Sequence, residues 1–309
     1  MIKHFTPQKS TTVRARSRTP SSAHWLVQRC PLLGMWLLAE LFVAPRVRVP
    51  PLGPLPGASQ RELRIGKRRV RVHSLGAGPL VLLVHGWQGG AYQLESLALA
   101  LRDAGFRVAL FDMPGHGEAS GWSTHGREFI EIIQAVAAAL GPLHAVIGHS
   151  LGGTAALMAC AQGVAANGVV ALSPMPSFDL ALRSYARGFG LTPPLRERLA
   201  RRLEARIGIR REDFDLARLQ PELPVLLVHD LLDRAVPARH TRALRESWPG
   251  ATLFETIGFG HNRGLQAKHV SRAIVAFLLS LPGDQFDEPA DREREGEDDA
   301  PSSNMSDAS

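Results

Sequence analysis

The chain has 309 residues, of which 45% are hydrophobic, so it can bury one large core or form two domains. Its formal net charge of +7 is unevenly distributed along the chain. Residues 1–72 are basic, with fourteen Lys and Arg against two acids, whereas residues 284–309 are acidic, with ten acids against two Arg. The section between them is close to neutral, so the basic balance gives no support to nucleic-acid binding. The two cysteines, Cys30 and Cys160, are too few for a disulfide framework, and a reducing, cytoplasmic location is expected.

Residues 1–60 are expected to form a basic, largely unstructured extension with one short apolar helix. Residues 1–30 are rich in Arg, Ser, Thr and Pro and show no apolar period. The apolar stretch 31–45, PLLGMWLLAELFVAP, is shorter than the roughly 20 residues of a membrane span and lacks the cleavage site of a signal peptide. It predicts a helix that lies on the domain or hangs free. A weak association with a membrane surface through this segment is the alternative.

An alternation of strands and helices begins near residue 61. The polar and apolar residues of 62–76 alternate as in a half-exposed hairpin. Buried strands are predicted at the apolar runs 79–86, 106–112, 144–149, 168–174 and 224–230, with a weaker strand at 251–257. Helices are predicted at 91–104, 127–140, 152–166 and 265–281. This order predicts an α/β domain over residues 61–282, with a doubly wound, mostly parallel sheet and helices on both faces.

The segment Gly148-His149-Ser150-Leu151-Gly152 has the form G-x-S-x-G and lies between a predicted buried strand and a predicted helix. In that context the serine occupies a strained turn that raises its Oγ above the carboxyl edge of the sheet. Side chains at the flanking positions would collide with the turn, and glycine avoids that collision. Ser150 is therefore the candidate nucleophile. A Gly/Ser turn without catalytic function is the alternative.

A serine hydroxyl needs a base to take its proton and an acid to orient that base. The partners are expected after later strands, in the order acid and then histidine. Asp233 follows the strand 224–230, and His261 lies in a glycine-flanked loop before the last helix. Asp230 is the competing acid, but it stands at the last position of the strand. Asp233 is preferred because it lies further into the loop, where a histidine can reach it.

The attacked carbonyl oxygen also needs hydrogen-bond donors when negative charge collects on it. One candidate donor is the backbone N–H of Leu151, directly after the serine. The other is the N–H of Trp87 in the segment HGWQGG, which follows the strand 79–84. A loose connection through Gly89 and Gly90 is the alternative interpretation of that segment.

Together these segments resemble the α/β-hydrolase fold superfamily of serine esterases, lipases and relatives. The matching texts are HGW (85–87), DMPGHGEAS (112–120), GHSLGG (148–153), DLLDRAVP (230–237) and GFGHNRGL (258–265). The resemblance implies Ser150 as nucleophile, Asp233 as acid and His261 as base, with Trp87 and Leu151 as oxyanion donors and a structural role for 112–120. It departs from many relatives at Asp230, where they have glycine.

The resemblance also implies a short helical cap, for which residues 177–220 are the candidate segment. Arginine is dense there, which predicts a solvated helix face. Contact of these arginines with an anionic substrate or an acidic membrane surface is the alternative. The acidic residues 283–309 are expected to form a disordered tail.

The sequence thus predicts a serine hydrolase that cleaves carboxylic esters of small or medium acyl groups through an acyl-enzyme intermediate. Its expected partner is a small-molecule acyl substrate, and no metal, cofactor or nucleic acid is required. Acyl transfer on the same triad is one alternative function. A binding or membrane-surface protein that retains the fold without turnover is another.

Overall fold

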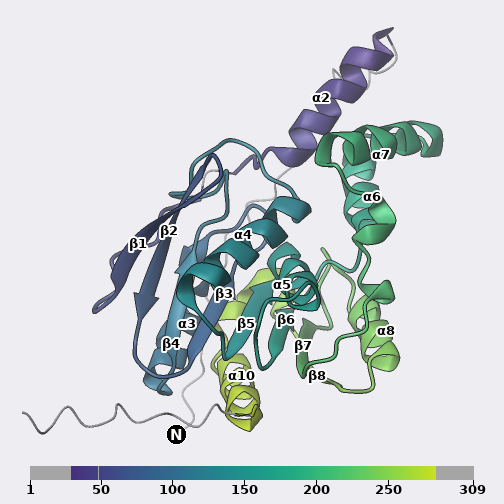
Figure 1. The fold of residues 1–309 in the computed structure, drawn as a ribbon. Coiled ribbons are helices and arrows are strands. Elements are labelled where there is room, and N and C mark those ends of the chain that lie inside the picture. The colour runs from purple at the N-terminus through teal and green to yellow at the C-terminus, as the bar shows by residue number, and fades with distance from the viewer. Residues whose placement is uncertain (1–28, 48, 283–309) are drawn as a thin grey trace, which may run out of the picture.

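An eight-stranded sheet forms the centre of the computed structural model, which describes residues 29–47 and 49–282 (Figure 1). The strand order is β1-β2-β4-β3-β5-β6-β7-β8. The strands are β1 (Ser59–Ile65), β2 (Arg68–Leu75), β3 (Leu80–Val84), β4 (Arg107–Phe111), β5 (Ala145–His149), β6 (Val169–Leu172), β7 (Val225–Asp230) and β8 (Ala251–Thr256). β2 pairs antiparallel with β1 and β4, and the strands from β4 to β8 pair in parallel. The predicted α/β class with a mostly parallel sheet is confirmed. The predicted acidic tail lies outside the described residues.

Helices cover both faces of this sheet, so β3, β5, β6 and β7 are buried at every position. On β3, Leu82 and Val84 pack with Phe129 in one buried cluster, whereas the cluster on the opposite face holds their neighbour Leu83 together with Ile274. The first face carries α4 (Gly126–Leu140), α5 (Leu151–Ala161) and α8 (Arg239–Ser247), and the second carries α3 (Glu95–Asp103) and α10 (Lys268–Ser280). The two faces of the sheet are therefore covered by helices. The residues that follow the carboxyl ends of the parallel strands lie beyond these covered faces, where they can form a site.

Three predicted helices differ in length from the observed ones. The helix expected at 152–166 ends at Ala161, because Gly163 turns the chain with a left-handed φ of 102°. The helix expected at 91–104 is divided into the 3₁₀ turn η1 (Ala91–Leu94) and α3. The last helix begins at Lys268, since the extended backbone of Ala267 separates it from the 3₁₀ turn η4 (Gly264–Gln266).

A further group of helices lies beyond the sheet (Figure 1). The segment between β6 and β7 forms α6 (Phe178–Gly188) and α7 (Pro193–Ile207), followed by the 3₁₀ turns η2 (Arg211–Asp213) and η3 (Leu216–Arg218). The apolar stretch near the N-terminus forms α2 (Pro31–Val43), which lies against α7 and points its N-terminal end away from the sheet (Figure 1). No helix of the described residues has the length and apolar character needed to cross a membrane.

Candidate active site

Ser150 stands at the sharp turn between β5 and α5. Its φ of 52° and ψ of −120° are a strained conformation for a residue with a side chain. A Cβ atom on Gly148 would come within 2.3 Å of the Gly152 carbonyl oxygen, and one on Gly152 within 2.4 Å of the His85 carbonyl oxygen. The two glycines of the motif are therefore required by backbone that passes directly beside them.

The structure brings Ser150, His261 and Asp233 together in one hydrogen-bonded series. His261 Nε2 lies 3.0 Å from Ser150 Oγ, and His261 Nδ1 lies 2.7 Å from Asp233 Oδ2. Asp233 follows β7, as the sequence predicted. His261 lies in a four-residue helix, α9 (Gly260–Arg263), rather than in the expected glycine-flanked loop. A proton can pass from the hydroxyl to the imidazole, and the carboxylate faces the opposite ring nitrogen.

The carboxylate of Asp233 is buried and held in its ionised form. Its Oδ1 accepts hydrogen bonds from the backbone N–H groups of Ala235 at 2.8 Å and Val236 at 2.9 Å. Its Oδ2 lies 3.4 Å from Nε2 of the buried His229, in addition to the contact with His261. Burial alone raises the pKa of Asp233, but the hydrogen bonds from the two histidines and from Val236 outweigh it and hold the pKa well below its usual range.

The competing acid, Asp230, has a different set of partners. Its Oδ2 accepts from the Thr256 hydroxyl and from the Phe259 N–H, each at 2.9 Å, and its Oδ1 accepts from the Leu232 N–H at 3.0 Å. Burial opposes ionisation of Asp230, but these bonds and one from the Gly260 N–H lower its pKa. Asp230 thus fastens the end of β8 and the segment that carries His261, and it is Asp233 that contacts the imidazole.

His149, the residue before the nucleophile, contacts His261 as well, and the sequence did not single it out. Its Nε2 donates to the carbonyl oxygen of His261 at 2.9 Å, and the two ring centres are 4.8 Å apart. Nδ1 has no hydrogen-bond partner among the described residues. Burial, and after it the neighbouring His261, lowers the pKa of His149 to about 3, so its ring stays neutral. Its place in the G-x-S-x-G motif was the only sequence signal for it.

The loop after β3 is braced by the segment that the sequence predicted to be structural. Asp112 accepts from the Ala91 N–H at 2.7 Å, and Nε2 of His116 accepts from the Gln88 N–H at 3.1 Å. His85 in turn accepts from the Met113 N–H at 2.9 Å. Burial lowers the pKa of both His85 and His116, the latter to about 4, so both accept these bonds as neutral rings. The backbone around Trp87 is therefore fixed from several sides.

Of the two predicted oxyanion donors, Leu151 directly follows Ser150, and Trp87 lies in the loop after β3, the strand beside β5. Leu151 is the first residue of α5, where backbone N–H groups have no acceptor within the helix. Trp87 and Leu151 both line the cavity into which Ser150 opens. This position is suitable for donors to an oxygen on a carbon attacked by Ser150.

That cavity has a volume of about 500 Å³ and is bounded mainly by apolar side chains. Its walls come from the elbow, from the cap, from the loop before α4 and from α2. The aromatic residues among them are Phe42, Trp87, Phe178, Tyr185 and Phe214. Such an apolar cavity with a nucleophile and a few polar groups at one end is typical of a site for a small ligand.

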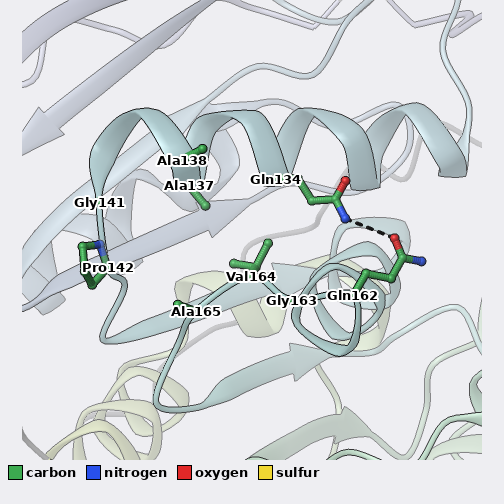
Figure 2. Close-up of a pocket in the computed structure, with 9 residues that line it drawn as sticks. All are labelled: Gln134, Ala137, Ala138, Gly141, Pro142, Gln162, Gly163, Val164 and Ala165. Carbon is green, nitrogen blue, oxygen red and sulfur yellow. Dashed lines mark hydrogen bonds between the residues drawn. The ribbon is translucent and has the colours of Figure 1, made fainter.

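A second depression, of about 410 Å³, lies between the C-terminal parts of α4 and α5 (Figure 2). Gln134 and Gln162 face each other across it and form a hydrogen bond of 3.1 Å. The rest of its wall is small side chains such as Ala137 and Ala138. No titratable side chain lines it, and it shares no lining residue with the cavity at Ser150. We assign no chemistry to it.

Several arginines of the cap bind carboxylates on its surface. Arg206 lies 3.0 Å from Glu40 of α2, and Arg211 pairs with Glu197. These pairs agree with the solvated helix face expected from the sequence.

The chain is similar to known proteins in sequence and in fold. A model described as "Alpha/beta hydrolase family" matches residues 81–296. A pimeloyl-[acyl-carrier protein] methyl ester esterase of Xanthomonas oryzae pv. oryzae is 29% identical over 260 residues, which cover 69% of this chain and 100% of that protein. Among solved structures, an esterase of Pyrococcus furiosus has a TM-score of 0.62 at 18% identity and covers 78% of this chain and 99% of its own. A thioesterase domain from the curacin biosynthetic pathway has a TM-score of 0.55 at 18% identity, over 72% of this chain and 99% of the domain.

Proposed function

The chain belongs to the alpha/beta hydrolase family, and from that premise we propose that it cleaves carboxylic esters of small or medium acyl groups with Ser150 as nucleophile. The observation that carries the proposal is the unbroken series of hydrogen bonds from Ser150 Oγ through His261 to Asp233. A hydroxyl in this setting can lose its proton to the imidazole while the ionised carboxylate stabilises the imidazolium that forms.

The reaction has two halves. Ser150 Oγ attacks the ester carbonyl carbon while His261 Nε2 takes the hydroxyl proton, and the carbonyl oxygen becomes an oxyanion next to the N–H groups of Leu151 and Trp87. The imidazolium then gives that proton to the leaving alcohol, and the acyl group stays on Ser150. In the second half His261 takes a proton from water, and the hydroxide formed attacks the acyl carbon. The carboxylic acid leaves, and the proton returns to Ser150.

The size of the cavity supports acyl groups larger than acetyl. A volume of about 500 Å³ bounded by aromatic and aliphatic side chains favours an extended apolar chain over a single methyl group. The Xanthomonas relatives are named for the methyl ester of a pimeloyl group on acyl carrier protein. That ester is therefore the first natural substrate class to assay.

The test combines an active-site label with a panel of chromogenic esters of increasing acyl length. We expect a fluorophosphonate to label the wild-type protein on Ser150 and to leave the Ser150→Ala variant unlabelled. Ester hydrolysis is expected to fall by at least about 10⁴-fold in the same variant. Labelling that persists in Ser150→Ala contradicts the assignment of the nucleophile. Wild-type protein that is labelled but passes the acyl group to an added alcohol faster than to water identifies an acyltransferase instead.

A further inference from the structure

We propose that α2 is a wall of the substrate cavity and that Phe42, near its C-terminal end, sets the length of the apolar acyl group that the site accepts. This inference rests on the proposed function. It assigns a binding role to a segment that precedes residues 81–296, the part of the chain that matches the family model.

Phe42 lies on the same cavity as the nucleophile. Its side chain and that of Ser150 both line the volume of about 500 Å³. The Phe42 ring packs edge-on against Tyr185, with ring centres 5.0 Å apart, and its centre lies 5.9 Å from that of Phe178. These two partners belong to α6, so an aromatic wall is built jointly by α2 and the cap.

Polar contacts fix α2 in this place through Tyr185. The Tyr185 hydroxyl donates to the carbonyl oxygen of Leu38 at 2.8 Å and accepts from Arg46 Nη2 at 3.1 Å. The Arg46 guanidinium also lies 5.2 Å from the centre of the Phe189 ring. The tyrosine hydroxyl thus donates one hydrogen bond and accepts another, both with residues close to Phe42 in the chain. These bonds restrict how far α2 can move away from α6.

Further contacts join α2 to the other walls of the cavity. Glu40 forms the ion pair with Arg206 of α7, and the carbonyl oxygen of Val43 accepts from the Thr124 N–H at 2.8 Å, in the loop before α4. Met35 and Leu38 are buried in the same cluster as the cap residues. Because α2 is attached to α6, α7 and this loop, Phe42 has a fixed position relative to the cavity.

The chemistry of the wall indicates the class of group that it holds. Phe42 faces a surface whose other members include Phe178, Ile207 and Phe214. The charged lining residues Arg187 and Arg234 are both exposed, so the buried part of the wall carries no full charge. An uncharged, extended acyl chain fits this lining, because burying a charge there without a partner is costly.

Two substitutions of opposite size test the proposal. Phe42→Trp reduces the space at the wall, and Phe42→Ala enlarges it. For nitrophenyl esters from acetyl to dodecanoyl, we expect the preferred acyl length to become shorter in Phe42→Trp and longer in Phe42→Ala. The dodecanoyl to butyryl ratio of kcat/KM is expected to change by about tenfold in opposite directions, since one methylene in an apolar pocket is worth about that factor.

Leu33→Ala is the matched control, because Leu33 lies on the same helix but is 52% exposed. We expect its acyl-length profile to be that of the wild type. If α2 only supports the cap, both Phe42 variants lose activity on all esters alike and keep the wild-type preference, which overturns the proposal.

Thermal unfolding shows whether each variant is folded, and Phe42→Leu replaces Phe42→Ala if the latter is not. Failure of the proposed function can be distinguished from failure of this inference. If the protein is not a serine hydrolase, the wild type itself does not react with the fluorophosphonate.

Discussion

His149 Nε2 donates a hydrogen bond of 2.9 Å to the backbone carbonyl oxygen of His261. The neighbour of the nucleophile in the sequence is thereby tied to the base, which lies on a segment 112 positions away. The bond fixes the backbone of α9, and the tilted ring of His149, whose centre is 4.8 Å from that of His261, limits rotation of the imidazole. His149 acts through His261 and is a positioning residue.

Replacement of His149 by Ala should therefore lower kcat more than it changes KM. We expect a decrease of about 10- to 100-fold in kcat, because small displacements of a catalytic group are costly. His149→Gln, whose amide N–H can donate to the same carbonyl, should recover part of the loss. Steady-state kinetics on one chromogenic ester separates the two parameters. Equal losses in the Ala and Gln variants would speak for packing alone.

The neutral ring of His149 also predicts how stability depends on pH. Its folded pKa of about 3 is below the value of about 6.5 in the unfolded chain, so between these values the unfolded state binds a proton that the folded state does not. Stability is therefore lost as the pH falls below about 6.5. The contribution to the slope approaches about 1.4 kcal/mol per pH unit.

The His149→Gln variant isolates this effect. Its free energy of unfolding in urea, measured from pH 7 to pH 4, should fall less steeply than that of the wild type by about that slope. His116→Gln should show the same change down to pH about 4, because burial lowers the pKa of His116 to about 4. Parallel curves for wild type and both variants would refute the prediction.

The two acids after β7 make separate contributions that substitution can resolve. Asp233→Asn keeps the size of the side chain but removes the charge that faces His261 Nδ1, and kcat should fall by about 10³- to 10⁴-fold. Asp230→Asn weakens the bonds to Thr256 and to the Phe259 N–H. It should lower the melting temperature and reduce kcat by about tenfold at most. A larger loss of kcat at position 230 than at 233 would reverse the assignment of the acid.

The fold and the main contacts of the site were predictable because the signals for them are local. Buried strands are recognisable as short apolar runs, and G-x-S-x-G between a strand and a helix specifies a turn. In parallel α/β sheets the strands end at one edge, so residues after β5, β7 and β8 had to meet there. The order of Ser150, Asp233 and His261 was therefore enough to expect their association.

The role of α2 was not predictable in the same way. Its sequence is apolar on most sides, so no face indicates a partner. Its hydrogen-bond partner Tyr185 lies 147 positions beyond Leu38, whose carbonyl oxygen accepts from the tyrosine hydroxyl. Likewise, the hydrogen bonds of Asp230 to Thr256 and Phe259 depend on how β8 lies beside β7. Such contacts follow from tertiary packing, and no pattern within either segment encodes them.

The turn at Ser150 predicts a strict requirement for glycine at position 148. An alanine Cβ there would come within 2.3 Å of the Gly152 carbonyl oxygen and 2.5 Å of the Gly153 N, so the start of α5 must shift. We expect Gly148→Ala to cost about 1 to 3 kcal/mol of stability and to slow fluorophosphonate labelling of Ser150 at least about tenfold. Gly250→Ala is the control, because a Cβ at Gly250 meets nothing within 4 Å, and its stability should stay within about 0.5 kcal/mol of the wild type. Labelling of Gly148→Ala at the wild-type rate would mean that the nucleophile does not depend on this close approach of backbone.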